Sequence, residues 1–138
     1  MDREAIKKIL PHREPMLLID ETELDGGVAV SRATVRGDEF YLQGHFPGNP
    51  VVPGVILCEM MAQSACLLVN SGGGKYTPYF TGIKNVKFKG KVKPGDTVTF
   101  KTQLTAQKAA FYFVKSDGYT GGELCVSGEL SFAVVPEE

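Results

Sequence analysis

One long apolar segment constrains the fold of this chain more than any other feature. It opens at Pro53-Gly54 and is predicted to run as a helix to about Asn70, where Ser71-Gly72-Gly73-Gly74 provides a stop signal. Its apolar side chains fall on every face of that helix, which indicates burial on all sides rather than a position on a surface. Such a helix requires other elements to enclose it.

Most of the remaining chain has the alternation of a β-strand. Leu124, Val126, Leu130, Phe132 and Val134 keep a period of two over eleven residues, and apolar residues also alternate with polar ones in the segments Val86–Val92 and Val98–Leu104. The other predicted elements are a short amphipathic helix over Asp2–Leu10 that Pro11 ends, an extended run over Met16–Ile19, a hairpin turn at Asp25-Gly26-Gly27 leading into Val28–Val35, and turns at Pro94-Gly95-Asp96 and Ser116-Asp117-Gly118.

One buried helix and five or six antiparallel strands have one economical arrangement. We predict a single α+β domain over residues 1–138, in which a curved antiparallel sheet wraps a long buried central helix. A sheet that wraps only partly leaves its edges and one helix flank exposed. Dimerisation would cover them.

Composition excludes several classes of function. A net charge of −1 and a pI near 6.1 argue against a nucleic-acid-binding protein. The apolar segment is interrupted by Glu59, Gln63 and Ser64 and is shorter than the roughly 20 residues of a membrane span. No secretory signal is visible and the three cysteines form no CxxC pair, so we expect a soluble cytoplasmic protein with free thiols.

The candidate chemistry lies in and beside the loop that precedes the helix. His45 stands between Gly44 and Phe46-Pro47-Gly48 in a long Gly/Pro-rich segment, and such loops are often functional. Glu59 is an acid among apolar helix residues, where desolvation favours the protonated, proton-donating form. An imidazole and a carboxyl group in an apolar setting predict an acid–base enzyme.

Each candidate also has a structural interpretation. His45 could be a solvated loop residue, and Glu59 could simply be bonded to Gln63 one helical turn away. The free N–H of Gly54 at the helix start could polarise a carbonyl group, or Gly54 could only relieve crowding after Pro53. Neither a metal site nor covalent catalysis is expected, because the histidines lack metal-ligand spacing and no nucleophile has an activating partner.

A run of lysines follows later in the chain. This lysine ribbon could be a solvated face or a dock for an acidic partner. It consists of Lys84, Lys87, Lys89, Lys91 and Lys93.

Four segments form a combination that is highly specific. They are Leu10-Pro11-His12-Arg13-Glu14-Pro15-Met16-Leu17-Leu18-Ile19-Asp20, the segment from Gly44-His45-Phe46-Pro47-Gly48 through Gly54-Val55 to Glu59-Met60-Met61-Ala62-Gln63, and the strand segments Phe80–Phe88 and Val92–Asp96. Together they resemble one known family, the (3R)-hydroxyacyl-[acyl-carrier-protein] dehydratases of type II fatty acid synthesis. The resemblance spans nearly the whole chain.

This resemblance implies a hot-dog fold, without cofactor or metal, assembled as a dimer or a trimer of dimers. It implies that His45 removes the C2 proton of the substrate, that protonated Glu59 helps the C3 hydroxyl leave, and that each pair forms across a dimer interface. The residues implied to bind substrate are Gly54, Phe46, Val55, Gln63 and Tyr79, the last as a gate of the acyl tunnel. The lysine ribbon would suit acyl carrier protein, which carries the substrate on its phosphopantetheine arm.

The expected reaction is dehydration of (3R)-3-hydroxyacyl-[acyl-carrier-protein] to the trans-2-enoyl form. A related dehydratase/isomerase branch carries Asp at the position of Glu59, so the glutamate favours the plain dehydratase. Two required protonation states predict a bell-shaped dependence of rate on pH. The alternatives are a hot-dog thioesterase, an enoyl-thioester hydratase, and a module that binds acyl carrier protein without catalysis.

Overall fold

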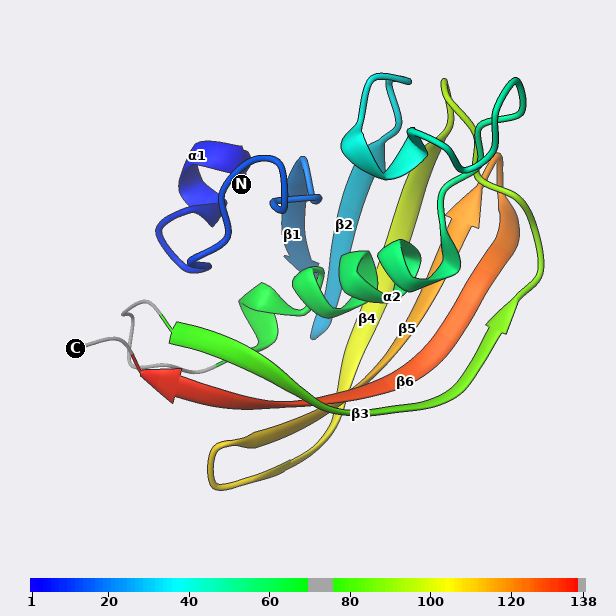
Figure 1. Ribbon diagram of the computed structural model, residues 1–138. Coiled ribbons are helices and arrows are strands. Elements are labelled where there is room, and N and C mark those ends of the chain that lie inside the picture. Colours follow the sequence, from blue (N-terminus) through cyan, green and yellow to red (C-terminus); the bar gives the residue numbers. More distant parts are fainter. Residues whose placement is uncertain (70–75, 137–138) are drawn as a thin grey trace.

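A six-stranded antiparallel sheet curves around one helix. The computed structural model describes residues 1–69 and 76–136, and in it helix α2 (Gly54–Gln63) lies across the concave face of the sheet (Figure 1). The strand order is β1-β2-β4-β5-β6-β3. The strands are β1 (Glu21–Asp25), β2 (Val28–Thr34), β3 (Tyr76–Phe88), β4 (Thr97–Lys108), β5 (Phe111–Thr120) and β6 (Glu123–Pro136). The predicted α+β architecture, the hot-dog arrangement, is confirmed.

The hairpin between β1 and β2 forms where the sequence predicts it. Asp25 faces Val28 across a two-residue loop, and Gly26 and Gly27 have φ angles of 57° and 86°. Two successive positive φ angles define the turn that matches the twist of the flanking strands, and glycine adopts them without steric cost.

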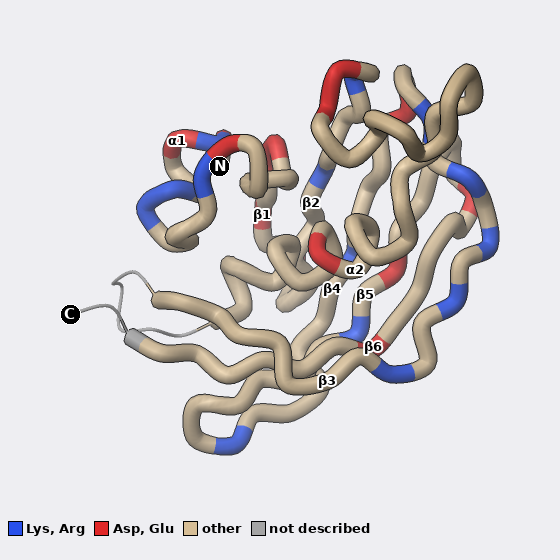
Figure 2. Tube along the Cα trace, viewed as in Figure 1, with Lys and Arg blue, Asp and Glu red and all other residues tan. Residues whose placement is uncertain are grey.

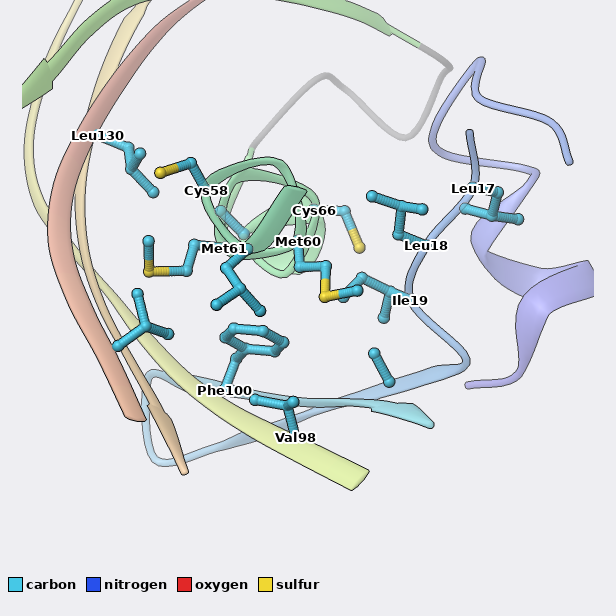
Figure 3. Close-up of a cluster of buried hydrophobic side chains, with 14 of the residues drawn as sticks. Leu17, Leu18, Ile19, Cys58, Met60, Met61, Cys66, Val98, Phe100 and Leu130 are labelled. Atoms are coloured by element: carbon cyan, nitrogen blue, oxygen red, sulfur yellow. The ribbon is translucent and has the colours of Figure 1, made fainter. Parts of the chain in front are cut away.

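The concave face of the sheet and one side of α2 form the core. Met60 and Met61 of α2 are fully buried and belong to one cluster with Val98 and Phe100 of β4 (Figure 3). Leu17, Leu18 and Ile19 of the N-terminal segment complete the same cluster. The segment that precedes β1 is therefore part of the core and is held close to α2.

A chain of buried hydroxyl groups fixes the end of α2 to the sheet. Ser64 Oγ lies 2.6 Å from Thr102 Oγ1, which lies 2.8 Å from Ser116 Oγ. On the other side, the Ser31 hydroxyl donates to the Ser64 carbonyl and pairs with Thr22. Buried polar groups are costly unless they are bonded, so this chain favours one position of the helix over the sheet.

Helix α2 differs from its prediction in length and burial. It ends at Gln63 rather than near Asn70, because the Ser64 hydroxyl bonds back to Met61 O and the chain continues as the 3₁₀ turn η2 (Cys66–Leu68). The predicted stop at residues 70–74 lies outside the described residues. Burial on all sides is also wrong, since Val55 is 76% exposed.

The turn predicted at Ser116-Asp117-Gly118 is wrong, because these residues lie inside β5. Ser116 is fully buried and its hydroxyl is bonded to Thr102, and a Cβ at Gly118 would lie 2.7 Å from Val126 Cγ1. Contacts with neighbouring strands, rather than a turn, therefore explain why serine and glycine occur at these two positions. The actual turn follows at Gly121-Gly122.

The strand predicted over Val86–Val92 ends at Phe88. The N–H groups of Lys89 and Gly90 both donate to Cys125 O, at 2.7 and 3.2 Å, which interrupts the regular ladder.

The first twenty residues form an arm with little regular structure. Helix α1 (Arg3–Ile6) is shorter than the predicted Asp2–Leu10, and a turn closed by Leu10 N to Ile6 O follows it. The run Met16–Ile19 is not a strand, since Met16 and Leu17 both donate to Arg13 O. No helix in the described part of the chain is long and apolar enough to cross a membrane.

Candidate active site

His45 lies in a tight loop that leads directly into α2. The loop follows the 3₁₀ turn η1 (Phe40–Leu42) and is closed by reciprocal bonds between Phe46 and Asn49, at 3.1 and 2.8 Å, and by Val51 N to His45 O at 2.9 Å. The imidazole stacks on the Phe46 ring with centroids 4.1 Å apart. The orientation of His45 is thus set within seven residues of chain.

The backbone partner of His45 determines its tautomer. Nδ1 lies 2.9 Å from Val51 O. A carbonyl oxygen only accepts, so Nδ1 carries the hydrogen and the neutral ring has its free lone pair on Nε2. Nε2 is therefore the nitrogen that can act as a base.

Glu59 lies on the open flank of α2. Leu57, Cys58 and Met60 are buried against the sheet, whereas the Glu59 side chain retains 21% of its exposure. Val55, four residues earlier, is on the same flank and is the most exposed large apolar residue of the helix. The acid is therefore half-buried and accessible from the side of the helix that the sheet does not cover.

Two side chains contact the Glu59 carboxyl group. Gln63 Nε2 lies 2.9 Å from Glu59 Oε2, so the predicted bond between helix neighbours is present. His12 Nε2 lies 3.4 Å from the same oxygen. The Gln63 amide also accepts from Leu18 N at 2.9 Å and donates to Met16 O at 2.8 Å, which links the N-terminal arm to the acid.

A small cavity of about 60 Å³ opens beside Glu59. Its lining combines polar and apolar surface, and residues 76, 78 and 80 of β3 point into it by the alternation of a strand. The lining residues are Leu10, His12, Glu59, Ala62, Gln63, Tyr76, Pro78, Phe80 and Phe132. Tyr79, the residue predicted to gate the acyl tunnel, does not line this cavity and is 59% exposed.

Gly54 begins α2, and no backbone acceptor for its N–H occurs in the described residues. A Cβ at this position would lie 2.8 Å from Cζ of Phe88. The Phe88 ring therefore leaves no room for a side chain at this position. Phe88, Phe46 and Val55 are all largely exposed and give the start of α2 an uncovered apolar border.

The lysine ribbon lies on and beyond the end of β3, which is an edge strand (Figure 2). All five lysines are exposed, and none forms a salt bridge within residues 1–69 and 76–136. They form a positive surface whose charges are not paired with carboxylates in salt bridges among the described residues.

The cysteines are poor candidates for catalysis. Burial raises the pKa of the Cys66 thiol to about 12, and burial followed by the charge of Glu59 raises the pKa of Cys58. Neither thiol is suited to react as a thiolate near neutral pH. No cluster of three His, Cys, Asp or Glu residues in the described chain could hold a metal ion.

The described chain brings Glu59 and Gln63 together but does not join them to His45. No hydrogen bond or ion pair between His45 and Glu59 occurs within the described part of one chain. The residue that sequence reasoning gave no role is His12, which occupies the place beside Glu59. Its only signal was its position in the Leu10-Pro11-His12-Arg13 motif.

Comparisons with known proteins identify the family of this chain. Residues 20–129 match the ApeI-like family, described as ApeI dehydratase. A 3-hydroxyacyl-[acyl-carrier-protein] dehydratase FabZ of Caldicellulosiruptor saccharolyticus is 43% identical over 139 residues, which cover 96% of this chain and 98% of the relative. FabZ of Clostridium perfringens strain SM101 is 39% identical over 137 residues, covering 97% and 99%.

Among solved structures, the dehydratase heterocomplex ApeI:P from Xenorhabdus doucetiae has a TM-score of 0.80 at 20% identity and covers 96% of this chain and 91% of its own. The PaaI protein of E. coli has a TM-score of 0.64 at 20% identity, covering 83% and 82%. These structural likenesses show the fold alone. The family match and the full-length relatives together show that this chain belongs to the hot-dog 3-hydroxyacyl-[acyl-carrier-protein] dehydratase family, whose members are hydro-lyases.

Proposed function

We propose that this protein dehydrates (3R)-3-hydroxyacyl-[acyl-carrier-protein] to trans-2-enoyl-[acyl-carrier-protein] at a site shared between two copies of the chain. One observation carries the proposal: each chain presents two separate half-sites. Within residues 1–69 and 76–136, His45 Nε2 has no hydrogen-bond or ion-pair partner, and Glu59 lies on the flank of α2 that the sheet leaves open. A second copy would bring one half-site to the other.

The reaction follows from the groups present. His45 Nε2 takes the C2 proton, and the electrons of that C–H bond form the C2–C3 double bond as the C3–O bond breaks. Glu59 gives its proton to the departing hydroxyl, which leaves as water. The Gly54 N–H, at the positive end of the α2 dipole, stabilises the thioester oxygen as negative charge develops on it.

Exposed features of one chain favour dimerisation. Strand β3 is an unpaired edge of thirteen residues, and it carries exposed Tyr79, Phe80 and Ile83. Long apolar edges attract a further strand unless they are covered. A copy that pairs along β3 would cover this edge together with the apolar border of α2. A trimer of dimers would be built from this unit.

The first experiment is mass spectrometry of 3-hydroxyacyl-acyl carrier protein incubated with the wild type, His45→Ala and Glu59→Ala. The proposal expects loss of one water with the wild type and almost none with either variant. The reverse hydration of the enoyl form is run in parallel, because the equilibrium can favour the hydroxyacyl side. Release of free acid would identify a thioesterase. No change in either direction would leave a binding module.

Site sharing has its own test. His45→Ala and Glu59→Ala chains are each expected to be inactive, and mixing them under conditions of subunit exchange should restore activity. A mixed dimer contains one site with both groups intact. If exchange occurs without any recovery of activity, His45 and Glu59 do not act across the interface.

The lysine ribbon is proposed to dock acyl carrier protein through complementary charge. Lys89→Glu with Lys91→Glu should raise KM for the carrier-linked substrate and weaken its dependence on salt, while kcat stays close to the wild-type value. Lys108→Glu, an exposed lysine at the far end of β4, is the matched control. Equal effects at both places would make the ribbon an ordinary solvated face.

A further inference from the structure

The polar partners of Glu59 converge on one of its two oxygens. Gln63 Nε2 lies 2.9 Å from Oε2, and His12 Nε2 lies 3.4 Å from the same atom. Within residues 1–69 and 76–136, Oε1 has no hydrogen-bond or ion-pair partner. The carboxyl group is therefore contacted on one side and free on the other.

His12 reaches this position because the arm around it is fixed. The Arg13 guanidinium donates to three carbonyl groups of the arm, those of His12 at 2.7 Å, Leu10 at 3.0 Å and Lys7 at 3.3 Å. Leu10 is 1% exposed. The backbone on both sides of the imidazole is thus anchored, and the His12 side chain retains 18% of its exposure.

The surroundings of His12 also select its tautomer. Nδ1 is buried and has no hydrogen-bond partner among the described residues. A hydrogen on Nδ1 would be a buried donor without an acceptor, which is costly, whereas a hydrogen on Nε2 faces the Glu59 carboxyl group. The neutral ring therefore presents Nε2–H toward Oε2.

We infer that His12 is a positioning residue for Glu59, an inference that rests on the proposed dehydratase function. Gln63 and His12 present two N–H groups to Oε2, so Oε2 is the accepting oxygen and the acidic proton resides on Oε1. The Gln63 amide carries no charge, and a neutral His12 ring would likewise orient the acid without the ionising influence of an adjacent cation. His12 thereby determines which oxygen delivers the proton to the substrate hydroxyl.

The 3.4 Å contact is longer than a strong N–H···O hydrogen bond. Contacts of catalytic groups often shorten when substrate binds, and His12 lines the same cavity as Glu59. Substrate that fills the cavity would exclude water from the pair and strengthen the contact.

Two amide variants of matched polarity test this role. In His12→Gln the side-chain amide reaches as far as Nε2, whereas in His12→Asn it is one bond shorter and falls short of Glu59. We expect His12→Gln to keep kcat close to the wild-type value and His12→Asn to lower it by about tenfold, the value of one hydrogen bond to the reacting group. KM should change little in either variant.

Thermal unfolding is measured beside the kinetics, because a purely structural role would lower stability and activity together in both variants. Equal kcat losses in the two variants, unchanged kcat in both, or an effect confined to KM would each overturn the inference. A wild type without dehydratase activity would instead overturn the proposed function. An active wild type with insensitive His12 variants would overturn the positioning role alone.

Discussion

The two histidines of this chain meet opposite kinds of partner, and the partner decides what each ring can do. His45 Nδ1 faces the carbonyl oxygen of Val51, so its Nε2 is bare and basic. His12 Nε2 faces the carboxyl group of Glu59, and its Nδ1 is buried without a partner in the described chain. One ring offers a lone pair and the other offers an N–H.

They also differ in how they are held. The His45 loop closes on itself between Leu42 and Val51, so its geometry is local. The His12 contact joins residues 47 positions apart and depends on the arm lying against α2. Figure 1 shows the two regions at opposite ends of that helix, the loop at its start and the arm toward its end. A basic group can thus be oriented by a short loop, whereas this acid is oriented by tertiary structure.

The largest effect should come from removing the basic nitrogen without disturbing the loop. In His45→Asn the amide can still donate to Val51 O, but the base is lost. Turnover should fall by about 10²–10⁴-fold, the usual contribution of a general base. His45→Ala removes the loop bond as well and should also lower the thermal midpoint. If His45→Asn retained most of the wild-type activity, Nε2 would not be the base.

The next effect should come from breaking the tertiary support of the acid. Gln63→Met fills a similar volume but leaves Leu18 N–H buried without its acceptor. We expect the free energy of unfolding to fall by about 1–3 kcal/mol, measured in urea. Gln103→Met, at an exposed position on β4, should stay within about 0.5 kcal/mol of the wild type. Equal losses in the two variants would show that the link between arm and helix adds no stability.

This contrast also explains how far the sequence could predict the site. The fold followed from one apolar helix among alternating strands, and the bond between Glu59 and Gln63 followed from helical spacing. His45 stood out because its loop is defined by nearby glycines and prolines. All of these signals are local.

The features that were not predicted depend on residues distant in sequence. The contact of His12 with Glu59 requires the path of the arm, which no periodicity encodes. Ser116 and Gly118 are residue types typical of a turn. What explains them here is contact with Thr102 and Val126, which belong to other strands and could not be predicted from the local sequence. The end of α2 at Gln63 likewise depends on Ser64, whose hydroxyl bonds back to the helix and across to β4.

A smaller change in stability is expected at low pH, where protonation of Glu14 weakens its bonds within the arm. A hydrogen bond from its own backbone N–H, followed by bonds from Lys7 and Arg3, lowers the pKa of Glu14 to about 2. Because the folded pKa is depressed, this contribution to stability is complete above the ordinary value of 4.5 and is lost as pH falls toward 2.

Unfolding measured between pH 6 and about 2 should therefore show the difference between wild type and Glu14→Gln shrinking as the pH falls. Glu4→Gln removes one largely exposed pair with Lys7 and should have less effect than Glu14→Gln. A constant difference between wild type and Glu14→Gln across this range would show that Glu14 does not anchor the arm.

The last prediction concerns the tautomers of the two histidine rings in the wild-type protein. Correlation of ring carbon-bound protons with ring nitrogens by NMR distinguishes a bare nitrogen from a protonated one, and only two histidines contribute. Spectra of His45→Asn and His12→Gln assign the signals. We expect neutral His45 to be protonated on Nδ1 and neutral His12 on Nε2. The same tautomer in both rings would remove the distinction on which the separate roles of base and positioning donor depend.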